Sequence, residues 1–282
     1  MSADIGCAAP KPIVQQPFIR QQVVLALADI VEGLAVFRVW NLLATTDIRL
    51  RYRRTTLGAF WVTLSMGVFV AAISLVFGGL FQIDAARFVP FLTAGFILWG
   101  LLSNAISGSC LAFVNNEEFI KCQKMPFSIY IYRVLWENII IMGHNAVIYI
   151  VVMFIFHVNF SSTQFLFIPG IFLLLMNILW VMFVLGPVCA RYRDMPQIVA
   201  NILQVAFYVT PIIWEPSLLA GRRSMIVDWN PLYYIIEVAR APLLGAVPPA
   251  SAWLVSVILM VFGWLFALTV FALCRRRLSY WI

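Results

Sequence analysis

Long apolar stretches separated by short charged segments dominate the chain from residue 57 onward. A helix that crosses a bilayer needs about 20 mainly apolar residues. We therefore predict an all-α integral membrane protein with six transmembrane helices, in which residues 1–56 form a cytoplasmic N-terminal arm and residues 57–282 form the membrane domain. The predicted spans lie at approximately 60–82, 88–114, 135–158, 165–190, 197–215 and 251–274.

One apolar stretch before the first span has a different pattern. Residues 23–44 are apolar, but Asp29, Glu32, Gly33 and Arg38 fall in the middle of the stretch. A charge at the centre of a spanning helix costs about 2.5–3.5 kcal/mol on insertion scales, whereas a helix lying at the interface avoids most of that cost. We predict an amphipathic interface helix on the cytoplasmic surface, bent at Gly33.

Composition supports a membrane protein and excludes several other classes. The chain is 63% apolar, 11% of its residues are charged, and its mean hydropathy is +0.96. A soluble domain is roughly 45–50% apolar. Its five cysteines are widely spaced without a CxxC motif, so we expect neither a metal site nor a disulfide framework. The first 20 residues lack a continuous apolar core, which argues against a cleaved secretory signal.

The distribution of positive charge predicts the orientation. Seven lysines and arginines lie in the N-terminal arm, three in the 115–134 loop, two in the 190–196 loop and three in the C-terminal tail. Fifteen of the nineteen therefore lie on one face, and Arg87, Arg222, Arg223 and Arg240 lie on the other. Because cytoplasmic loops carry an excess of lysine and arginine, we predict that both termini are cytoplasmic.

A row of arginines immediately precedes the first span. The sequence "DIRLRYRRTTLGAFW", residues 47–61, contains Arg49, Arg51, Arg53 and Arg54. One interpretation is a topological anchor, because such side chains reach lipid headgroups. The other is a binding site for a lipid substrate that bears phosphate, because guanidinium groups match phosphate oxygens. On a helix the four side chains would cover more than half of the circumference, which favours the anchor.

Motifs that would supply energy or catalysis are absent from the sequence. It contains no GxxxxGK[ST], HExxH or GxSxG motif, so the chain has no ATP-binding P-loop of its own. Ionisable residues in and next to the predicted spans are few, and Arg133 and Glu137 are spaced to pair on one helix face. A proton-coupled carrier usually shows more intramembrane charge. We therefore expect any energy that the chain uses to come from a source outside it.

The cytoplasmic loop 115–128, "NNEEFIKCQKMPFS", is weakly amphipathic. Asn115 or Asn116 is predicted to cap a short helix, with glutamates in its first turn and Pro126 ending it. The loop is either an ordinary solvated connector or a short helix that docks into a partner protein.

Three segments together resemble a known family. They are "RLRYRRTTLGAFW" (49–61), "RYRDMPQIVANILQVAFYVTPIIW" (191–214) and "NPLYYIIEVARAPLLG" (230–245). In this order they resemble the membrane subunit of bacterial type-2 ABC exporters for polysaccharides, most of all the O-antigen exporter permeases. Ala59 departs from the pattern, since many relatives carry proline there.

This resemblance implies that the chain supplies the membrane half of a transporter and is not itself an enzyme. Two copies would form the pore, and two copies of a separate ABC ATPase subunit would bind beneath it and carry the ATP and Mg²⁺, while this chain holds no cofactor. The helix at 23–45 would be the interface helix, and the 115–128 loop would contain the coupling helix that receives ATP-driven motion. The residues expected to contact the ATPase subunit are Glu117, Glu118, Phe119, Lys121 and Lys124.

The implied substrate is a long glycan on a polyprenyl diphosphate carrier, moved from the cytoplasmic to the periplasmic face of the bacterial inner membrane. We expect the carrier diphosphate to meet Arg51, Arg53 or Arg54. The segment 215–249, which contains five prolines, is expected to form short re-entrant helices that close the periplasmic mouth. Proline disfavours a helical residue before it, so the bends are predicted at Thr210, Pro211, Asn230 and Pro231.

Aromatic residues near the predicted exit have two interpretations. A sugar polymer that slides needs flat aromatic surfaces, whereas many membrane proteins carry an aromatic belt at the interface. The residues concerned are Tyr208, Trp214, Trp229, Tyr233 and Tyr234.

Several alternatives stay open. The sequence does not separate O-antigen export from capsule or teichoic-acid export. A permease for drugs or small lipids would share the fold. A membrane enzyme acting on lipid-linked sugars would need a carboxylate or metal cluster at the interface, whereas the twelve acidic residues are scattered. Membrane lipids are expected partners, and nucleic acid is not.

Overall fold

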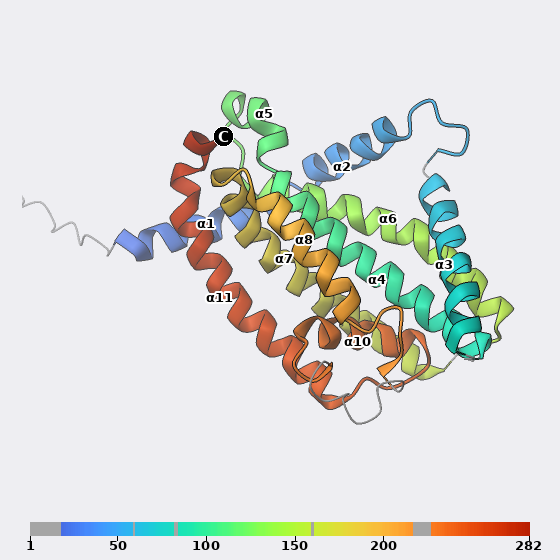
Figure 1. Ribbon diagram of the computed structural model, residues 1–282. Coiled ribbons are helices and arrows are strands. Elements are labelled where there is room, and N and C mark those ends of the chain that lie inside the picture. The colour runs from blue at the N-terminus through green and yellow to red at the C-terminus, as the bar shows by residue number, and fades with distance from the viewer. Residues whose placement is uncertain (1–17, 59, 82–83, 159–160, 217–226) are drawn as a thin grey trace, which may run out of the picture.

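The computed structural model of the 282-residue chain describes residues 18–58, 60–81, 84–158, 161–216 and 227–282 (Figure 1). Within these residues the regular structure consists of helices without strands, which confirms the predicted all-α class. The long helices are α3 (Phe60–Phe81), α4 (Ala85–Leu111), α6 (Ser128–Ile155), α7 (Phe167–Arg191) and α11 (Ala250–Trp281). The shorter ones are α1 (Phe18–Ala35), α2 (Phe37–Arg51), α5 (Glu117–Cys122), α8 (Met195–Val209), α10 (Pro231–Leu243) and the 3-10 turns η1 (Val114–Asn116) and η2 (Ser162–Leu166).

Helices α4 and α7 form the centre of the bundle. Helix α4 packs against α3, α6, α7, α8 and α10, and 78% of its most apolar window is buried. Helix α7 packs most extensively against α11 and also against α4 and α10. By contrast, α3 packs mainly against α6 and α4, and just 6% of its apolar window is buried. Most of the surface of α3 is therefore available to lipid or to another protein.

Five of the predicted spans correspond to helices long and apolar enough to cross a membrane. The predicted span 197–215 corresponds to α8, which has 15 residues and ends at Val209. At 1.5 Å per residue α8 is about 22 Å long, shorter than the roughly 30 Å hydrocarbon core of a bilayer. The count of six spans therefore stays a prediction.

The predicted gate segment contains one described helix. Helix α10 occupies 13 residues of the segment 215–249, which is also too short to span a bilayer. Its re-entrant placement stays a prediction. Arg222 and Arg223 lie outside the described residues.

The N-terminal arm forms two helices, but the predicted bend at Gly33 is wrong. Helix α1 continues through Gly33, and the break falls at Val36, whose φ and ψ are −86° and 42°. Gly33 instead allows α1 to pack closely against the start of α6, because a Cβ at this position would collide with Ser128 Oγ. Trp40 Nε1 then donates a hydrogen bond to Gly33 O at 3.1 Å across the break. Glycine is thus required here for close helix packing.

Figure 1 shows the two ends of the bundle. Helix α5 and the C-terminus lie at one end, which we call the α5 end, and α10 lies at the opposite end, the α10 end. Helix α8 runs from the α5 end towards α10, and α1 runs across α11 instead of alongside it.

Candidate functional site

Helix α5 presents a charged, solvent-facing segment at the α5 end. Glu118, Phe119, Lys121 and Lys124 are exposed, and Phe119 keeps 55% of its surface accessible. Lys121 Nζ lies 2.5 Å from Glu117 Oε1, and this hydrogen bond lowers the pKa of the Glu117 carboxyl. The five residues predicted to contact an ATPase subunit therefore lie together. Exposed aromatic residues such as Phe119 are enriched at protein contact surfaces.

The predicted capping of α5 is wrong. Asn116 occupies the N-cap position, but its side chain makes no capping hydrogen bond. Its Nδ2 donates to Ala112 O at 2.7 Å, and its Oδ1 accepts from Arg133 Nη1 at 2.6 Å. The oxygen that would cap the helix is thus occupied by a guanidinium group from α6. Helix α5 also ends at Cys122, before Pro126 is reached.

Two ion pairs join α2 to α6. Arg133 binds Asp47 with both branches of its fork, Nε to Oδ2 at 2.5 Å and Nη2 to Oδ1 at 2.6 Å. One turn further along each helix, Arg51 Nη2 lies 2.5 Å from Glu137 Oε1. The predicted pair between Arg133 and Glu137 is therefore wrong. Bidentate arginine–carboxylate contacts are stronger than single ones, and α2 supplies partners of opposite charge to both residues.

A cavity of about 610 Å³ lies beside these pairs, between α2, α3, α4 and α6. This α5-end pocket lies within the size range of small-molecule sites. Its polar lining comprises Asp47, Arg51, Tyr52, Asn104, Asn115, Asn116, Arg133, Glu137 and Asn138.

The arginine row divides into two groups. Arg51 lines the α5-end pocket and is paired with Glu137. Arg49, Arg53 and Arg54 are exposed, and within the described part of the chain they form no ion pair. Arg51 is therefore the arginine of the row that lines the α5-end pocket.

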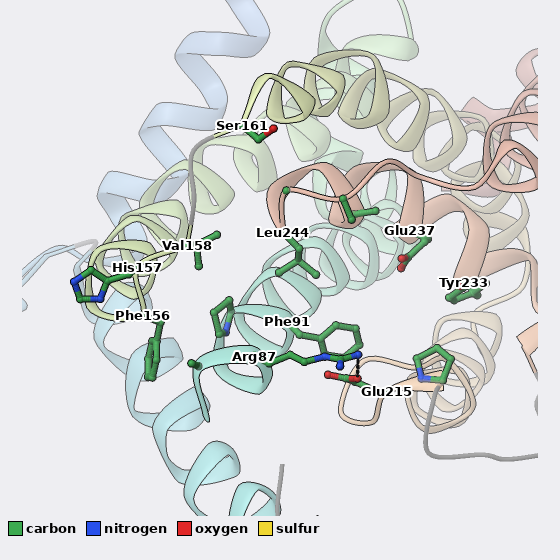
Figure 2. Close-up of a pocket in the computed structure, with 16 residues that line it drawn as sticks. Arg87, Phe91, Phe156, His157, Val158, Ser161, Glu215, Tyr233, Glu237 and Leu244 are labelled. Atoms are coloured by element: carbon green, nitrogen blue, oxygen red, sulfur yellow. Dashed lines mark ion pairs between the residues drawn. The ribbon is translucent and has the colours of Figure 1, made fainter. Parts of the chain in front are cut away.

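At the α10 end, a second cavity of about 800 Å³ opens between the start of α4, the residues after α6, and α10 (Figure 2). In this α10-end pocket Arg87 Nη2 lies 2.8 Å from Glu215 Oε2, drawn as the dashed line in Figure 2. Tyr233 and Glu237 of α10 also line the pocket. Its walls combine ion-paired charges with aromatic rings.

Arg240 of α10 is the largest fully buried side chain at this end, with 1% of its surface exposed. Its Nη1 donates to Pro211 O, and its Nε and Nη2 bind Glu237 Oε2 one turn earlier on α10. The guanidinium carbon also lies 4.2 Å from the centre of the Phe91 ring of α4, a cation–π distance. Arg240 therefore joins α10 to α4 and to the backbone just after α8.

The four residues predicted as bends lie where two helices end. Helix α8 ends at Val209, and Thr210 adopts an extended conformation before Pro211. Helix α10 begins at Pro231, and the Asn230 side chain caps it by accepting from Leu232 N at 3.0 Å. Asn230 Nδ2 also donates to Thr210 Oγ1 at 3.0 Å. The two helix ends are thus joined through buried polar side chains.

The predicted pore aromatics do not converge on one surface of a single chain. Tyr233 is buried and lines the α10-end pocket, whereas Tyr208 and Trp229 are 62% and 86% exposed. Trp214 and Tyr234 are half-buried, and the Trp214 indole donates to Tyr208 O at 3.1 Å.

Several residues that organise the two ends were missed by sequence reasoning. The local sequence pattern does not distinguish Asp47. It uses the charge of Asp29 only as an argument against a spanning helix, and it uses Arg240 only in the count of positive charges. Glu237 and Arg240 have the i, i+3 spacing of a helix pair, and that signal could have identified them. The partners of Asp29 and Asp47 lie far away in sequence, so spacing gives no signal for them.

The comparisons with known proteins identify the class. A family described as "ABC-2 type transporter" matches residues 38–244. The chain belongs to this family and is an integral membrane transport component.

Individual relatives of the chain carry a more specific name than the family. The chain is 22% identical over 206 residues to an O-antigen export system permease protein RfbA from Klebsiella pneumoniae, a match that covers 71% of this chain and 78% of the relative. It is 21% identical over 196 residues to the protein of the same name from Myxococcus xanthus, with 67% and 74% covered. The resemblance to O-antigen exporter permeases is confirmed.

Proposed function

We propose that this chain is the membrane subunit of an ATP-driven exporter that carries a polysaccharide linked to polyprenyl diphosphate across the bacterial inner membrane, as in O-antigen export. The observation that carries the proposal is the match to O-antigen export permeases over about two-thirds or more of both chains. Family membership over residues 38–244 supports the transport role.

ATP hydrolysis belongs to a separate subunit in this proposal, because the sequence lacks a P-loop. Two copies of that ATPase subunit would bind two copies of this chain at the α5 end, which would be cytoplasmic together with both termini. The exposed α5 residues, with Phe119 at their centre, support this contact. ATP and Mg²⁺ stay on the partner.

Substrate entry would begin at the arginine row. Arg53 and Arg54 are exposed and attract an anionic headgroup, and Arg51 lies at the edge of the α5-end pocket. A diphosphate can replace the Glu137 carboxylate on Arg51, since guanidinium binds both oxyanions through the same fork geometry. The row would thus both attract and bind the carrier.

The glycan path would run between two copies of the chain. Helix α8 exposes an apolar face that includes Ile202, Val205 and Tyr208, each more than 60% exposed. A second copy facing this surface would place Tyr208 at the exit, where aromatic rings stack on sugar faces. The α10 end, with the segment 215–249, would close the periplasmic mouth.

The experiment that tests this function is an ATPase assay in lipid vesicles. The chain is purified alone and after co-expression with its candidate ABC ATPase subunit, and each preparation is measured with and without lipid-linked glycan. We expect no turnover from the chain alone, and turnover that responds to the glycan from a stable complex.

Other results would overturn the proposal. Stimulation by drugs or short-chain lipids, without a response to glycan, would indicate a small-lipid or drug permease. If no complex forms and the chain alone alters the lipid-linked sugar, the chain is a membrane enzyme. Comparison of glycans with O-antigen, capsule and teichoic-acid linkages assigns the substrate.

Charge removal tests the entry site. In the triple variant Arg51→Gln, Arg53→Gln, Arg54→Gln we expect glycan-stimulated ATPase activity to fall by about 5- to 150-fold, the usual range of a coupling between sites. The matched control is Arg38→Gln, an exposed arginine of α2 outside the row. Unchanged stimulation in a normally inserted triple variant would show that the arginines are anchors only.

A further inference from the structure

The segment that contains α5 is fixed at its exit by a carboxylate from α1. Asp29 is 1% exposed, and its two oxygens accept hydrogen bonds from Phe127 N at 3.2 Å and Ser128 N at 2.9 Å. Ser128 Oγ returns a hydrogen bond to Asp29 O at 2.6 Å. These contacts join α1 to the first residues of α6, directly after the exposed segment 117–126.

The entrance of the same segment is fixed by a second, partly buried network. Asn116, the residue before α5, is 8% exposed and accepts a hydrogen bond from Arg133 Nη1. Arg133 at the same time holds Asp47 of α2 through two hydrogen bonds. The entrance of the segment is therefore joined to α2 through one guanidinium group of α6.

Both ends of the exposed segment are thus attached to the N-terminal arm, α1 at the exit and α2 at the entrance. Buried polar groups that lose their partners pay a large desolvation cost, so such contacts stay closed while the protein moves. A displacement of α5 must therefore displace α1 and α2 with it.

A third contact extends this unit to the last helix. Arg275 Nε of α11 donates to Asp29 Oδ2 at 2.7 Å, across 246 positions of sequence. Helix α11 packs along α7, one of the two central helices. Asp29 is therefore the point where the arm, the exit of the α5 segment and α11 meet.

We propose that Asp29 and Arg133 are positioning residues that make the α5 segment and the arm move as one body, and that Arg275 transmits this motion to α11. The proposal rests on the proposed function, since it concerns how motion received at α5 reaches the helix bundle. It adds a route that does not pass through the chain directly connecting α5 to α4 and α6.

The test uses the complex with the ABC ATPase subunit and separates transmission from folding. Arg275→Gln removes the guanidinium and leaves the two backbone hydrogen bonds of Asp29 in place. Arg276→Gln is the matched control, because Arg276 is the exposed neighbour and makes no ion pair in the part of the chain that the structure describes. Arg275→Lys is the conservative variant, since its ammonium group can still donate to Asp29.

We expect Arg275→Gln to form the complex and to keep its basal ATPase activity, whereas stimulation by lipid-linked glycan falls at least about fivefold. Arg276→Gln should match the unsubstituted chain, and Arg275→Lys should recover part of the stimulation. Hydrogen exchange of the Phe127 and Ser128 amides should be unchanged in Arg275→Gln, which shows that the exit contact is intact.

A separate variant tests the contact of Arg133 with Asn116 and Asp47 at the entrance of the α5 segment. Arg133→Gln frees Asn116 from Asp47, and Arg38→Gln is the control, an exposed arginine of α2 outside the arginine row and without an ion pair in the described ranges. We expect Arg133→Gln to lower glycan stimulation and to speed hydrogen exchange in 117–122 during ATP turnover, while Arg38→Gln changes neither.

The two proposals fail in different ways. If the complex of the unsubstituted chain shows no glycan-stimulated turnover, the proposed function fails and this inference falls with it. If that complex responds to glycan, and Arg275→Gln and Arg133→Gln respond within about twofold of it, the inference alone is overturned. A uniform loss of basal activity and stimulation that Arg275→Lys does not relieve would also overturn it, since a purely structural role predicts that result.

Discussion

At each end of the bundle a buried charged side chain forms hydrogen bonds with backbone groups, and the two side chains have opposite charges. At the α5 end, the buried Asp29 carboxylate accepts hydrogen bonds from two backbone N–H groups at the start of α6. At the α10 end, the buried Arg240 guanidinium donates to the Pro211 carbonyl just after α8. Helix ends leave N–H groups unsatisfied at the start and C=O groups at the finish. The sign of each buried charge matches the backbone groups that it serves.

The ends differ in where the neutralising charge lies. Arg240 is paired with Glu237 of its own helix, so the charges are neutralised within α10 where it contacts α4 and the backbone just after α8. Asp29 is paired with Arg275, which belongs to another helix and whose side chain is 31% exposed. The buried charge of Arg240 is therefore neutralised within α10, whereas neutralisation of Asp29 depends on α1 and α11 staying together.

The largest expected effect tests the Arg240–Glu237 pair at the α10 end. Arg240→Met leaves Glu237 without its partner and Pro211 O without its donor, so we expect a loss of about 3–5 kcal/mol in the free energy of unfolding. Unfolding in mixed detergent micelles measures this change. Arg53→Met, at an exposed position, should change stability by less than about 0.5 kcal/mol.

A double variant separates the cost of the unpaired Glu237 charge from the cost of the lost contacts. Adding Glu237→Gln to Arg240→Met removes the uncompensated charge, and we expect it to restore part of the lost stability. If the double variant is as unstable as the single one, the lost contacts with Pro211 and Phe91 account for the whole effect.

The next largest effect lies at the α5 end. Asp29→Asn keeps the side-chain shape but removes one acceptor and the negative charge, so we expect a loss of about 1.5–3 kcal/mol, the range for hydrogen bonds to charged groups. The loss is smaller than for Arg240→Met because Arg275 is partly exposed and can be solvated. The control is Glu32→Gln, an exposed acid on the same helix. A greater loss than that of Arg240→Met would contradict the comparison.

Close packing gives a third test of the two ends. A Cβ at Gly170 would lie 2.5 Å from Val238 O, a backbone atom of α10 that cannot rotate away, so Gly170→Ala should cost about 1–3 kcal/mol. Gly33→Ala meets Ser128 Oγ, which can rotate at the cost of its hydrogen bond to Asp29 O, so about 1 kcal/mol is expected. Gly78→Ala, with no atom within 4 Å, should not destabilise the protein. Equal losses at Gly170 and Gly33 would show that the two contacts are equally rigid.

The smallest effect concerns two residues in the left-handed region. His157 follows α6 with φ of 51°, and Val158 N donates back to Met153 O at 3.1 Å, as in a glycine-terminated helix. Arg54 follows α2 with φ of 68°. We expect His157→Gly and Arg54→Gly each to raise the free energy of unfolding by up to about 1 kcal/mol. His157→Ala is the control, because alanine keeps the strain and should bring no gain.

Sequence reasoning succeeded where a local pattern has one physical explanation. Five spans follow from apolar length, since a bilayer requires about 20 apolar residues. The ends of α8 and α10 follow from Thr210–Pro211 and Asn230–Pro231, since proline restricts the backbone wherever it occurs. It failed for the bend at Gly33, the capping of α5 and the partner of Arg133, because each depends on a helix distant in sequence.

The sequence by itself determined the class of this protein, its long helices and the clustering of charge around α5. Hydrophobic length and composition act along the chain and need no knowledge of neighbours. Only the tertiary structure decided which charged side chains form ion pairs. Asp29 pairs with Arg275, 246 positions away in the sequence, and Asp47 pairs with Arg133, 86 positions away. Burial makes an unpaired charge costly, so packing selects these partners, and spacing along one helix does not reveal them.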